Sequence, residues 1–368
     1  MKENSKYIQV KNQIKDWILE GKVKPGEKIY SENELVKRFG VSRHTVRQAI
    51  GVLVHEGWLY REHGSGTFCS NRLLQQTKRE SSKNIGVITT YMSDYIFPSI
   101  IRGIEQYLSS QGYSLIMAST NNDLEKEKQC LQTMLSKNID GLIVEPTKSS
   151  SANPNISYYL NLEQHHIPYL MINQYYQEIN PPHLVIDDEK GGFLATEHLI
   201  QYGHNKIIGI FKSDDLQGVN RMKGYIDAFR KYNLPFFPDM IVTYTTENKE
   251  EKIAEIRSLL EGKDRPTGMV CYNDSVALSV LNIVRSLNLS VPGDLSIVGY
   301  DDSQLATASE VKLTSIAHPK TQMGKDAAER IIAKIEGKSL ESGTDSMVYE
   351  PELIVRESTK RLASKIIT

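Results

Sequence analysis

The chain has 368 residues, of which 39% are hydrophobic and 24% charged, the composition of an ordinary folded protein of two or three domains. No apolar run approaches the roughly 18 residues that a membrane span requires, and the polar start carries no signal-peptide core. These features predict a cytoplasmic protein. The three cysteines lie far apart without a C-x-x-C pair, so neither a disulfide framework nor a zinc finger is indicated.

The charge is distributed unevenly along the chain. Residues 1–80 hold 15 Lys and Arg against 9 Asp and Glu, whereas the remaining residues hold 29 against 36. Basic segments attract polyphosphate, so this division favours a nucleic-acid-binding module joined to an acidic body with another task. A solvated basic surface is the alternative explanation.

Two helices are predicted at the start of the chain. Apolar residues recur on one side from Tyr7 until near Gly21, which is typical of an amphipathic helix that a glycine ends. A second helix begins at Ser31, because the S-x-x-E pattern with Glu34 forms a capping box. This helix stops at Gly40, one residue after Phe39.

A third helix follows after only two residues, with Ser42 as its N-cap and an apolar stripe through Val46, Ile50 and Leu53. Its other face carries Arg43, His44, Arg47 and Gln48. Two helices joined by so short a turn, the second with cationic and amide side chains at its start, indicate a helix-turn-helix that reads the major groove.

Beyond the third helix, the strand-like runs 58–62 and 67–69 predict a β-hairpin. Gly64 and Gly66 permit the positive φ angles of a tight turn between them. A hairpin in this position is the wing of a winged helix-turn-helix, whose tip follows the phosphate backbone. A nucleotide-phosphate cradle is the alternative, but the Gly-Ser-Gly is too short for G-x-G-x-x-G.

Residues 5–70 resemble the GntR-type winged-helix domain. The resemblance is carried by KIYSENEL at 28–35, FGVSRHTVRQAI at 39–50 and GSGTF at 64–68. It implies a DNA-binding domain over 1–70 that contacts double-stranded operator DNA. The expected DNA contacts lie at the start of the first helix, at the start of the third helix and on its exposed face, and in the wing. They are Lys6, Ser42, Arg43, His44, Thr45, Arg47, Gln48, His63, Gly64, Ser65, Gly66 and Thr67.

Residues 71–83 are polar and without periodicity, so they are expected to be a linker to a second domain over 84–368. In that domain, short apolar runs alternate with amphipathic stretches. The expected strands are 85–89, 114–118, 141–144, 169–172, 184–186, 206–211, 241–244, 268–271 and 296–298. The expected helices include 99–110, 125–137, 192–201, 220–232 and 275–287. Repeated βα units predict an α/β fold with two lobes, each a parallel sheet covered by helices on both faces.

Polar residues follow most of these strands. They are 91–95, 119–122, Glu145, Asn173, Asp187 with Asp188, Asp214 with Asp215, Asn273 with Asp274, and Asp301 with Asp302. Any one of them is often only the N-cap of the next helix. Because ligands gather at the carboxyl ends of parallel strands, their number favours a polyhydroxylated ligand, whose hydroxyls both donate and accept.

The body resembles the LacI/GalR-type effector domain, which shares its fold with periplasmic sugar-binding proteins. The resemblance covers 84–360 and is carried by DGLI at 140–143, HLIQYGH at 198–204, RMKGY at 221–225, YNDSVAL at 272–278 and LSIVGYDD at 295–302. Carried over by position, it implies sugar contacts from Asn173, Arg221, Asn273 and Asp301, with Asp274 packed against them.

A GntR-type head on a LacI-type body is similar to the L-arabinose-responsive repressors of Gram-positive bacteria. TTYMSDYIFPSIIRG at 89–103 and GLIVEPTK at 141–148 support this resemblance. The resemblance alone implies L-arabinose as effector, with no cofactor, and adds Tyr91, Asp94, Tyr95, Glu145 and Asp187 to the pocket. A homodimer is expected, because one recognition helix reads only a few base pairs.

The resemblance thus implies a repressor of arabinose utilisation genes that L-arabinose releases from its operator. Two other classes of protein are alternatives. The Asp-Asp pairs invite a glycoside hydrolase, in which two carboxylates flank the scissile bond. However, neither G-x-S-x-G nor H-E-x-x-H occurs, so neither catalytic nor metal-binding residues are expected. A transport receptor is the other alternative, but the predicted winged helix-turn-helix at the start of the chain does not favour it.

Overall fold

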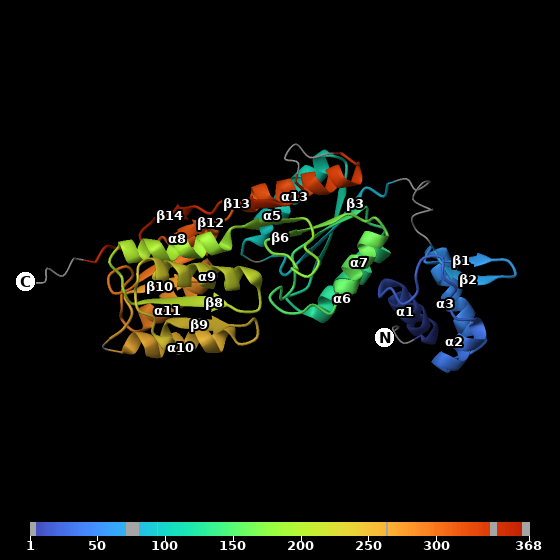
Figure 1. Cartoon of the computed structure of the whole chain (residues 1–368), viewed down its shortest axis with the longest axis horizontal. Helices are drawn as coiled ribbons and strands as arrows, with labels where there is room; N and C mark the ends of the chain where they lie inside the picture. The colour runs from blue at the N-terminus through green and yellow to red at the C-terminus, as the bar shows by residue number, and fades with distance from the viewer. Residues whose placement is uncertain (1–4, 71–80, 94, 263, 339–343, 363–368) are drawn as a thin grey trace, which may run out of the picture. The chain divides into compact units, whose positions relative to one another are not determined.

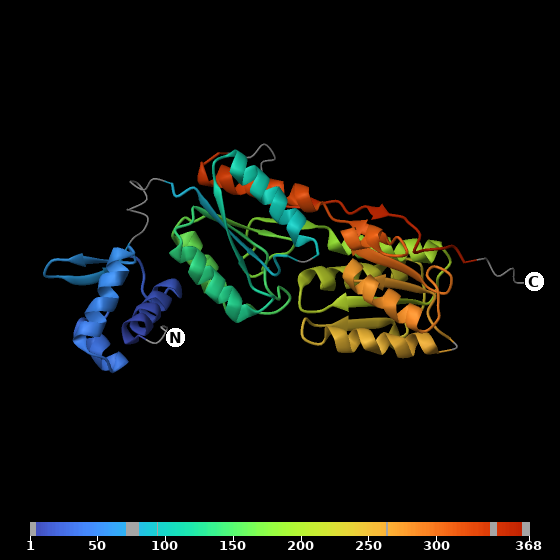
Figure 2. The same cartoon turned by 180° about the vertical axis from the view of Figure 1, so that it is seen from behind.

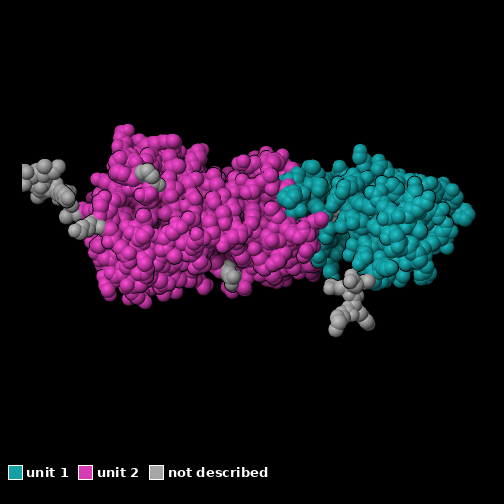
Figure 3. Space-filling model, turned by 90° about the horizontal axis from the view of Figure 1, so that it is seen from below, with its two compact units in different colours: residues 1–84, 131–140, 154–168 teal, residues 85–130, 141–153, 169–368 magenta. Residues whose placement is uncertain are grey.

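The computed structural model describes residues 5–70, 81–93, 95–262, 264–338 and 344–362. The chain forms two compact units (Figure 3), one of residues 1–84, 131–140 and 154–168 and one of residues 85–130, 141–153 and 169–368. The expected domain limits therefore stay a proposal, and most of the expected linker 71–83 lies outside the described residues. No helix in the described ranges is long and apolar enough to cross a membrane.

The described part of the N-terminal module is a winged helix-turn-helix (Figure 1), as expected. Its elements are α1 (Lys6–Leu19), α2 (Glu32–Phe39), α3 (Arg43–His55), β1 (Leu59–Glu62) and β2 (Gly66–Cys69). The two strands pair antiparallel as the wing. Ile14, Leu35, Val46, Ile50 and Leu53 are buried, so the apolar stripes of the three helices face one another.

Local capping fixes the helix-turn-helix. The Ser31 hydroxyl accepts from the backbone N–H of Glu34, whose carboxylate accepts from the Ser31 N–H at 2.7 Å. The Ser42 hydroxyl accepts from the Thr45 N–H at 3.2 Å. Gly40 ends α2 with a φ of 61°, a conformation that favours glycine. The expected capping box and both expected helix starts are therefore confirmed.

Two six-stranded sheets form the body, and we call the parts built on them the N-lobe and the C-lobe. The N-lobe sheet has the order β13-β7-β6-β5-β3-β4, from β3 (Asn84–Thr89), β4 (Ser114–Ser119), β5 (Gly141–Val144), β6 (Tyr169–Ile172), β7 (His183–Ile186) and β13 (Met347–Tyr349). The C-lobe sheet has the order β14-β12-β11-β10-β8-β9, from β8 (Ile207–Lys212), β9 (Ile241–Tyr244), β10 (Gly268–Cys271), β11 (Ser296–Asp301), β12 (Thr314–Ala317) and β14 (Leu353–Ile354).

Helices cover both faces of the C-lobe sheet, as Figures 1 and 2 show. One face packs against α8 (Asp188–Gln201) and α9 (Leu216–Lys231), with Leu199 and Phe229 in that core. The other face packs against α10 (Lys249–Glu261) and α11 (Asp274–Ser286), with Ile256 and Val280 in that core. Parallel pairing joins β8, β9, β10, β11 and β12. The predicted parallel α/β lobe is confirmed except at one edge, where β14 pairs antiparallel with β12.

In the N-lobe, α5 (Phe97–Ser110) and α13 (Lys320–Ile335) pack together on one core with the sheet. Their backbones approach closely at two glycines. A Cβ on Gly103 would lie 2.2 Å from the carbonyl oxygen of Thr321, and one on Gly324 would lie 2.1 Å from that of Ile100. The other helices in the described ranges are α6 (Leu124–Ser136), α7 (Ile156–Gln164), α12 (Gln304–Ala308) and the 3-10 turn η1 (Pro238–Met240).

The chain passes between the two lobes at three places. These are the step from β7 to α8, the step from β12 to α13, and the step from β13 to β14. Each lobe therefore contains segments from distant parts of the sequence, and three short connecting segments join the lobes.

The observed bounds differ from the expected ones by more than two residues in two respects. Expected helices 192–201 and 220–232 begin four residues earlier, at Asp188 and Leu216, because Asp187 and Asp215 cap them. Glycines in the first turns of these two helices interrupt the apolar pattern, so the sequence did not indicate where the helices begin. No strand was expected beyond 298, yet β11 continues to Asp301, and β12, β13 and β14 follow.

Candidate functional site

The candidate DNA-reading surface lies on α3. Arg43, His44, Arg47 and Gln48 are exposed, whereas Val46, Ala49, Ile50 and Leu53 on the opposite side are buried. Thr45 is half-buried beside them. The four expected side chains at the start of this helix thus share one solvent-facing side.

The first turn of α2 positions the two arginines. The Nε atom of Arg47 lies 2.8 Å from Oε2 of Glu32, and the guanidinium of Arg43 donates to the side-chain oxygen of Asn33. The Arg47 ion pair is made through Nε, so its two Nη groups stay available for the bidentate contact that arginine makes with guanine. The geometry suits direct readout of bases.

The wing presents a small exposed tip over residues 62–66. Gly64 and Gly66 have φ angles of 76° and 129°, which L side chains rarely adopt. Of the other expected DNA contacts, Lys6 is exposed at the start of α1, Ser42 is exposed at the cap of α3 and Thr67 is half-buried in β2.

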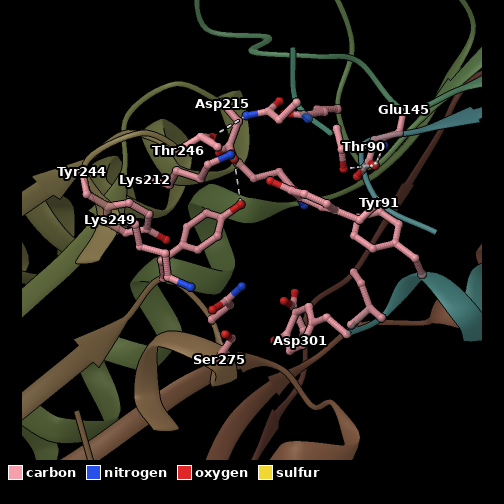
Figure 4. Close-up of a pocket in the computed structure, with 18 residues that line it drawn as sticks. Thr90, Tyr91, Glu145, Lys212, Asp215, Tyr244, Thr246, Lys249, Ser275 and Asp301 are labelled. Carbon is pink, nitrogen blue, oxygen red and sulfur yellow. Dashed lines mark hydrogen bonds and ion pairs between the residues drawn. The ribbon is translucent and has the colours of Figure 1, made fainter. Parts of the chain in front are cut away.

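A cleft of about 270 Å³ lies between the two lobes (Figure 4). The N-lobe lines it with Thr90, Tyr91, Tyr95, Ile96, Phe97, Asn122, Glu145 and Gln174. The C-lobe lines it with Lys212, Asp215, Gln217, Tyr244, Thr246, Lys249, Tyr272, Asn273, Ser275 and Asp301. Charged, amide, hydroxyl and aromatic groups thus surround one concave space at the carboxyl ends of the strands.

Five of the expected effector residues line this cleft: Tyr91, Tyr95, Glu145, Asn273 and Asp301. Asp94 lies outside the described residues. Asn173, Asp187, Arg221 and Asp274 do not line the cleft, and each of them holds neighbouring groups in place instead.

Arg221 is buried behind the C-lobe wall of the cleft. Its Nε atom lies 2.8 Å from Oδ1 of Asp188, its Nη1 donates to the carbonyl of Tyr272 at 2.7 Å, and its Nη2 lies 3.6 Å from Oδ1 of Asp301. Burial raises the pKa of Asp188 to about 6, although the guanidinium opposes this rise. Arg221 therefore acts on the cleft through Asp301 and Tyr272.

Asp274 joins the strand ends of the C-lobe. Its Oδ2 accepts from the backbone N–H of Ser303 at 2.7 Å and from the Ser303 hydroxyl at 2.9 Å, while its Oδ1 accepts from the Ser315 hydroxyl at 2.7 Å. Burial raises its pKa to about 7. Both oxygens of this carboxyl therefore accept hydrogen bonds from other residues of the C-lobe.

In the N-lobe, Asn173 supports Glu145. The Asn173 amide donates to Oε1 of Glu145 at 2.8 Å, and its oxygen lies 3.0 Å from Nε2 of His318. Thr90 donates to the other Glu145 oxygen through its N–H at 2.9 Å and its hydroxyl at 2.5 Å. Burial raises the pKa of Glu145. Asp187 caps α8 by accepting from the Lys190 N–H at 2.9 Å.

Tyr95 joins the two lobes beside the cleft. Its hydroxyl donates to the carbonyl of Tyr300 at 2.9 Å and accepts from the backbone N–H of Asp274 at 3.0 Å. Its φ of 60° is unusual for a tyrosine, and such strain persists only where the surroundings hold it. The phenol thus bridges an N-lobe loop to two C-lobe strand ends.

Sequence reasoning missed much of the C-lobe wall, above all Lys212. Its Nζ atom lies 3.2 Å from Oδ1 of Asp214 and 3.0 Å from Oδ2 of Asp215. Asp215 also accepts from the hydroxyl of Tyr272 at 2.8 Å. The Asp-Asp pair was recognised as polar, but a lysine at a strand end ordinarily points to solvent, so only the adjacent carboxylates could have signalled its burial.

Two family models match the chain. Residues 6–69 match the gntR family of bacterial regulatory proteins, and residues 196–359 match the periplasmic binding protein-like domain. Among solved structures, the transcription regulator CcpA of Lactococcus lactis is similar with a TM-score of 0.67 and 27% identity, covering 77% of this chain and 100% of that one. A LacI family regulator from Enterococcus faecium with bound ribose is similar with a TM-score of 0.64 and 25% identity, covering 76% of this chain and 100% of that one.

Two full-length relatives share one name. The arabinose metabolism transcriptional repressor of Halalkalibacterium halodurans is 54% identical and covers 98% of both chains. That of Geobacillus stearothermophilus is 51% identical over 98% of this chain and 100% of the relative. With this identity over its whole length, the chain belongs to the family of arabinose metabolism transcriptional repressors, DNA-binding regulators rather than enzymes, with a GntR-type domain before a LacI-type domain.

Proposed function

We propose that this repressor holds the operators of arabinose utilisation genes and that L-arabinose, bound in the cleft between the lobes, releases it from DNA. The observation that carries the proposal is the cleft itself, which surrounds a space for one small ligand with groups from both lobes (Figure 4). The names of the two full-length relatives support the choice of sugar. No cofactor is needed for binding and release.

The chemistry of the cleft suits a sugar. The carboxylates of Glu145 and Asp301 accept hydrogen bonds from hydroxyls, while Lys212 and the Asn273 amide donate them. Aromatic rings such as Tyr91 offer apolar faces to the C–H surface of a pyranose. We include Tyr95, Asp94, Asn173, Asp187, Arg221 and Asp274 in the proposed effector site, the last four as positioning residues.

The proposed reader of DNA is the N-terminal domain over 1–70, joined through 71–83 to an effector and dimerisation domain over 84–368. Arg43, His44, Arg47 and Gln48 on α3 would meet base edges in the major groove, and residues 63–67 of the wing would follow the backbone. A homodimer would place two such helices on a two-fold operator. Because the proposed target is chromosomal DNA, the protein would act in the cytoplasm.

Release requires that sugar and DNA favour different arrangements of the lobes. The three connections between lobes allow them to close on a ligand, and Tyr95 is one contact that such movement alters. A ligand shifts the balance only by its preference for one arrangement, typically about 1–3 kcal/mol of coupling.

The test uses the full-length protein and a labelled palindromic duplex selected from random-sequence DNA by binding to it. Fluorescence anisotropy measures duplex affinity with and without saturating L-arabinose, D-xylose, D-galactose or D-ribose, and calorimetry measures binding of each sugar. We expect L-arabinose alone to weaken duplex binding, by about 5- to 150-fold. Equal duplex affinity in every sugar would refute the proposal.

A further inference from the structure

Lys212 is a buried cation in the wall of the cleft. It is the last residue of β8, and only 14% of its side chain is exposed. Figure 4 shows that it extends from the C-lobe into the space that Glu145 and Asp301 also border. A charged group withdrawn from water in this way needs partners.

Two carboxylates keep this lysine charged. Burial alone would lower the pKa of Lys212, but Asp215 and Asp214, with Nζ at 3.0 and 3.2 Å, raise it above its usual value. The ammonium is therefore present at every physiological pH. Neutralisation of the two aspartates is one role that it fills.

The hydrogen-bonding capacity of Lys212 is not used up by these partners. Oδ1 of Asp215 accepts from the Gly218 N–H at 2.7 Å and its Oδ2 from Tyr272, while Oδ2 of Asp214 accepts from the Thr246 N–H at 3.0 Å. An ammonium has three N–H groups, and its ion-pair partners among the described residues are two oxygens, Oδ1 of Asp214 at 3.2 Å and Oδ2 of Asp215 at 3.0 Å. The described residues supply no third acceptor to it.

An acceptor with spare capacity lies on the same wall. Oδ1 of Asp301, at the end of β11, is buried and makes no hydrogen bond among the described residues, and it lies 3.6 Å from Nη2 of Arg221. A donor and an acceptor with spare hydrogen-bonding capacity in one cleft match a ligand whose hydroxyls donate and accept.

We propose that Lys212 is a specificity-determining residue that donates a charge-assisted hydrogen bond to one oxygen of the bound sugar. This inference rests on the proposed function of the cleft. A site built around such a donor discriminates against sugars that lack the matching oxygen, because the buried ammonium is then left short of a partner.

The test is a thermodynamic cycle between protein and ligand. Calorimetry on the full chain measures L-arabinose and each of its monodeoxy analogues against the wild type and Lys212→Met. We expect wild type to bind one analogue about 10- to 100-fold more weakly than L-arabinose, in the range of a hydrogen bond to a charged group. Lys212→Met should bind L-arabinose correspondingly weakly and should not discriminate against that analogue. Lys206→Met, which removes a lysine paired with Asp264 before the other end of β8, should discriminate as the wild type does.

The double variant Lys212→Met/Asp214→Asn removes one positive and one negative charge, so it keeps the local charge balance if the single variant does not fold. The inference is overturned if the affinity lost by replacing Lys212 and the affinity lost by removing a sugar hydroxyl are additive for every analogue, in whichever variant folds. Lys212 would then serve only to neutralise the neighbouring aspartates. Failure of the wild type to bind L-arabinose or the other sugars would instead refute the proposed function, and the inference with it.

Discussion

Arg221 and Asp188 form an ion pair inside the C-lobe, with 2.8 Å between Nε and Oδ1 and at most 4% of either side chain exposed. The pair joins α9 to the first residue of α8 and places the guanidinium beside Asp301 at the cleft. An interaction so withdrawn from water affects stability differently from the ion pairs on the surface of the same helices.

Arg221→Ala should lower the free energy of unfolding by about 3–5 kcal/mol, because it leaves the buried carboxylates of Asp188 and Asp301 without their cation. Urea denaturation measures this loss. Lys223→Ala on the same helix removes an ion pair with Glu189 whose side chains are 60% and 43% exposed, so its effect should not exceed about 1 kcal/mol. Equal small losses for both variants would contradict the buried pair.

Asp274 should make stability depend on pH. Its folded pKa, raised to about 7 by burial, exceeds that of an unfolded aspartate, so the folded state retains the proton at higher pH. The resulting stabilisation is full below about pH 4 and is lost as pH rises through about 7. The free energy of unfolding should therefore fall from pH 5 to pH 8 more steeply in the wild type than in Asp274→Asn.

Asparagine can keep the geometry at this position, with its oxygen toward Ser303 and its amide toward the Ser315 hydroxyl. Asp188, whose pKa is also raised, is present in both proteins, so its contribution cancels in the comparison. Parallel pH profiles of the two proteins would exclude the assigned role of Asp274.

Arg47→Ala should weaken binding of the selected duplex by about 1–3 kcal/mol, the range for loss of an arginine that contacts a base. Sugar affinity should be unchanged, because Arg47 belongs to the DNA-binding module. Fluorescence anisotropy and calorimetry provide the two measurements. Lys252→Ala, on α10 of the C-lobe, controls for the loss of one positive charge. An unchanged duplex affinity in Arg47→Ala would rule out α3 as the reader.

Gly192→Ala should destabilise the C-lobe, by about 1–3 kcal/mol or more. A Cβ there would lie 2.1 Å from the carbonyl oxygen of Arg221, so α8 and α9 would have to separate. At Gly262, which has a φ of −66°, no atom lies within 4 Å of an added Cβ, and Gly262→Ala should stay within about 0.5 kcal/mol of the wild type. Thermal unfolding of the two variants tests the close approach of the helices.

The features predicted correctly from sequence depend on neighbours within a few residues. The capping box of Ser31 with Glu34, the cap at Ser42 and the glycines of the wing need only local hydrogen bonds and local φ angles. The strands up to 271 were placed within one residue, since apolar runs bounded by polar residues define them.

The roles of cleft residues could not be obtained in this way. Family position suggested Arg221 as a sugar contact, yet its burial depends on Asp188 and Asp301, which are 33 and 80 positions away in the sequence. The only local signal for Lys212 was the adjacent pair Asp214 and Asp215, because its burial arises when β8, β9 and β10 align their ends. Long-range packing therefore decides which polar groups line a cleft and which support it.

The position of α13 and β13 has a consequence for biosynthesis. Both belong to the N-lobe, but they are encoded at 320–335 and 347–349, after nearly all of the C-lobe. While a nascent chain is still on the ribosome, the N-lobe sheet lacks its β13 edge and α5 lacks its partner helix. The first lobe to begin synthesis is thus among the last parts to be completed. A premature stop codon just before 320 would remove α13 and β13 from the N-lobe, although every residue that lines the cleft would still be encoded.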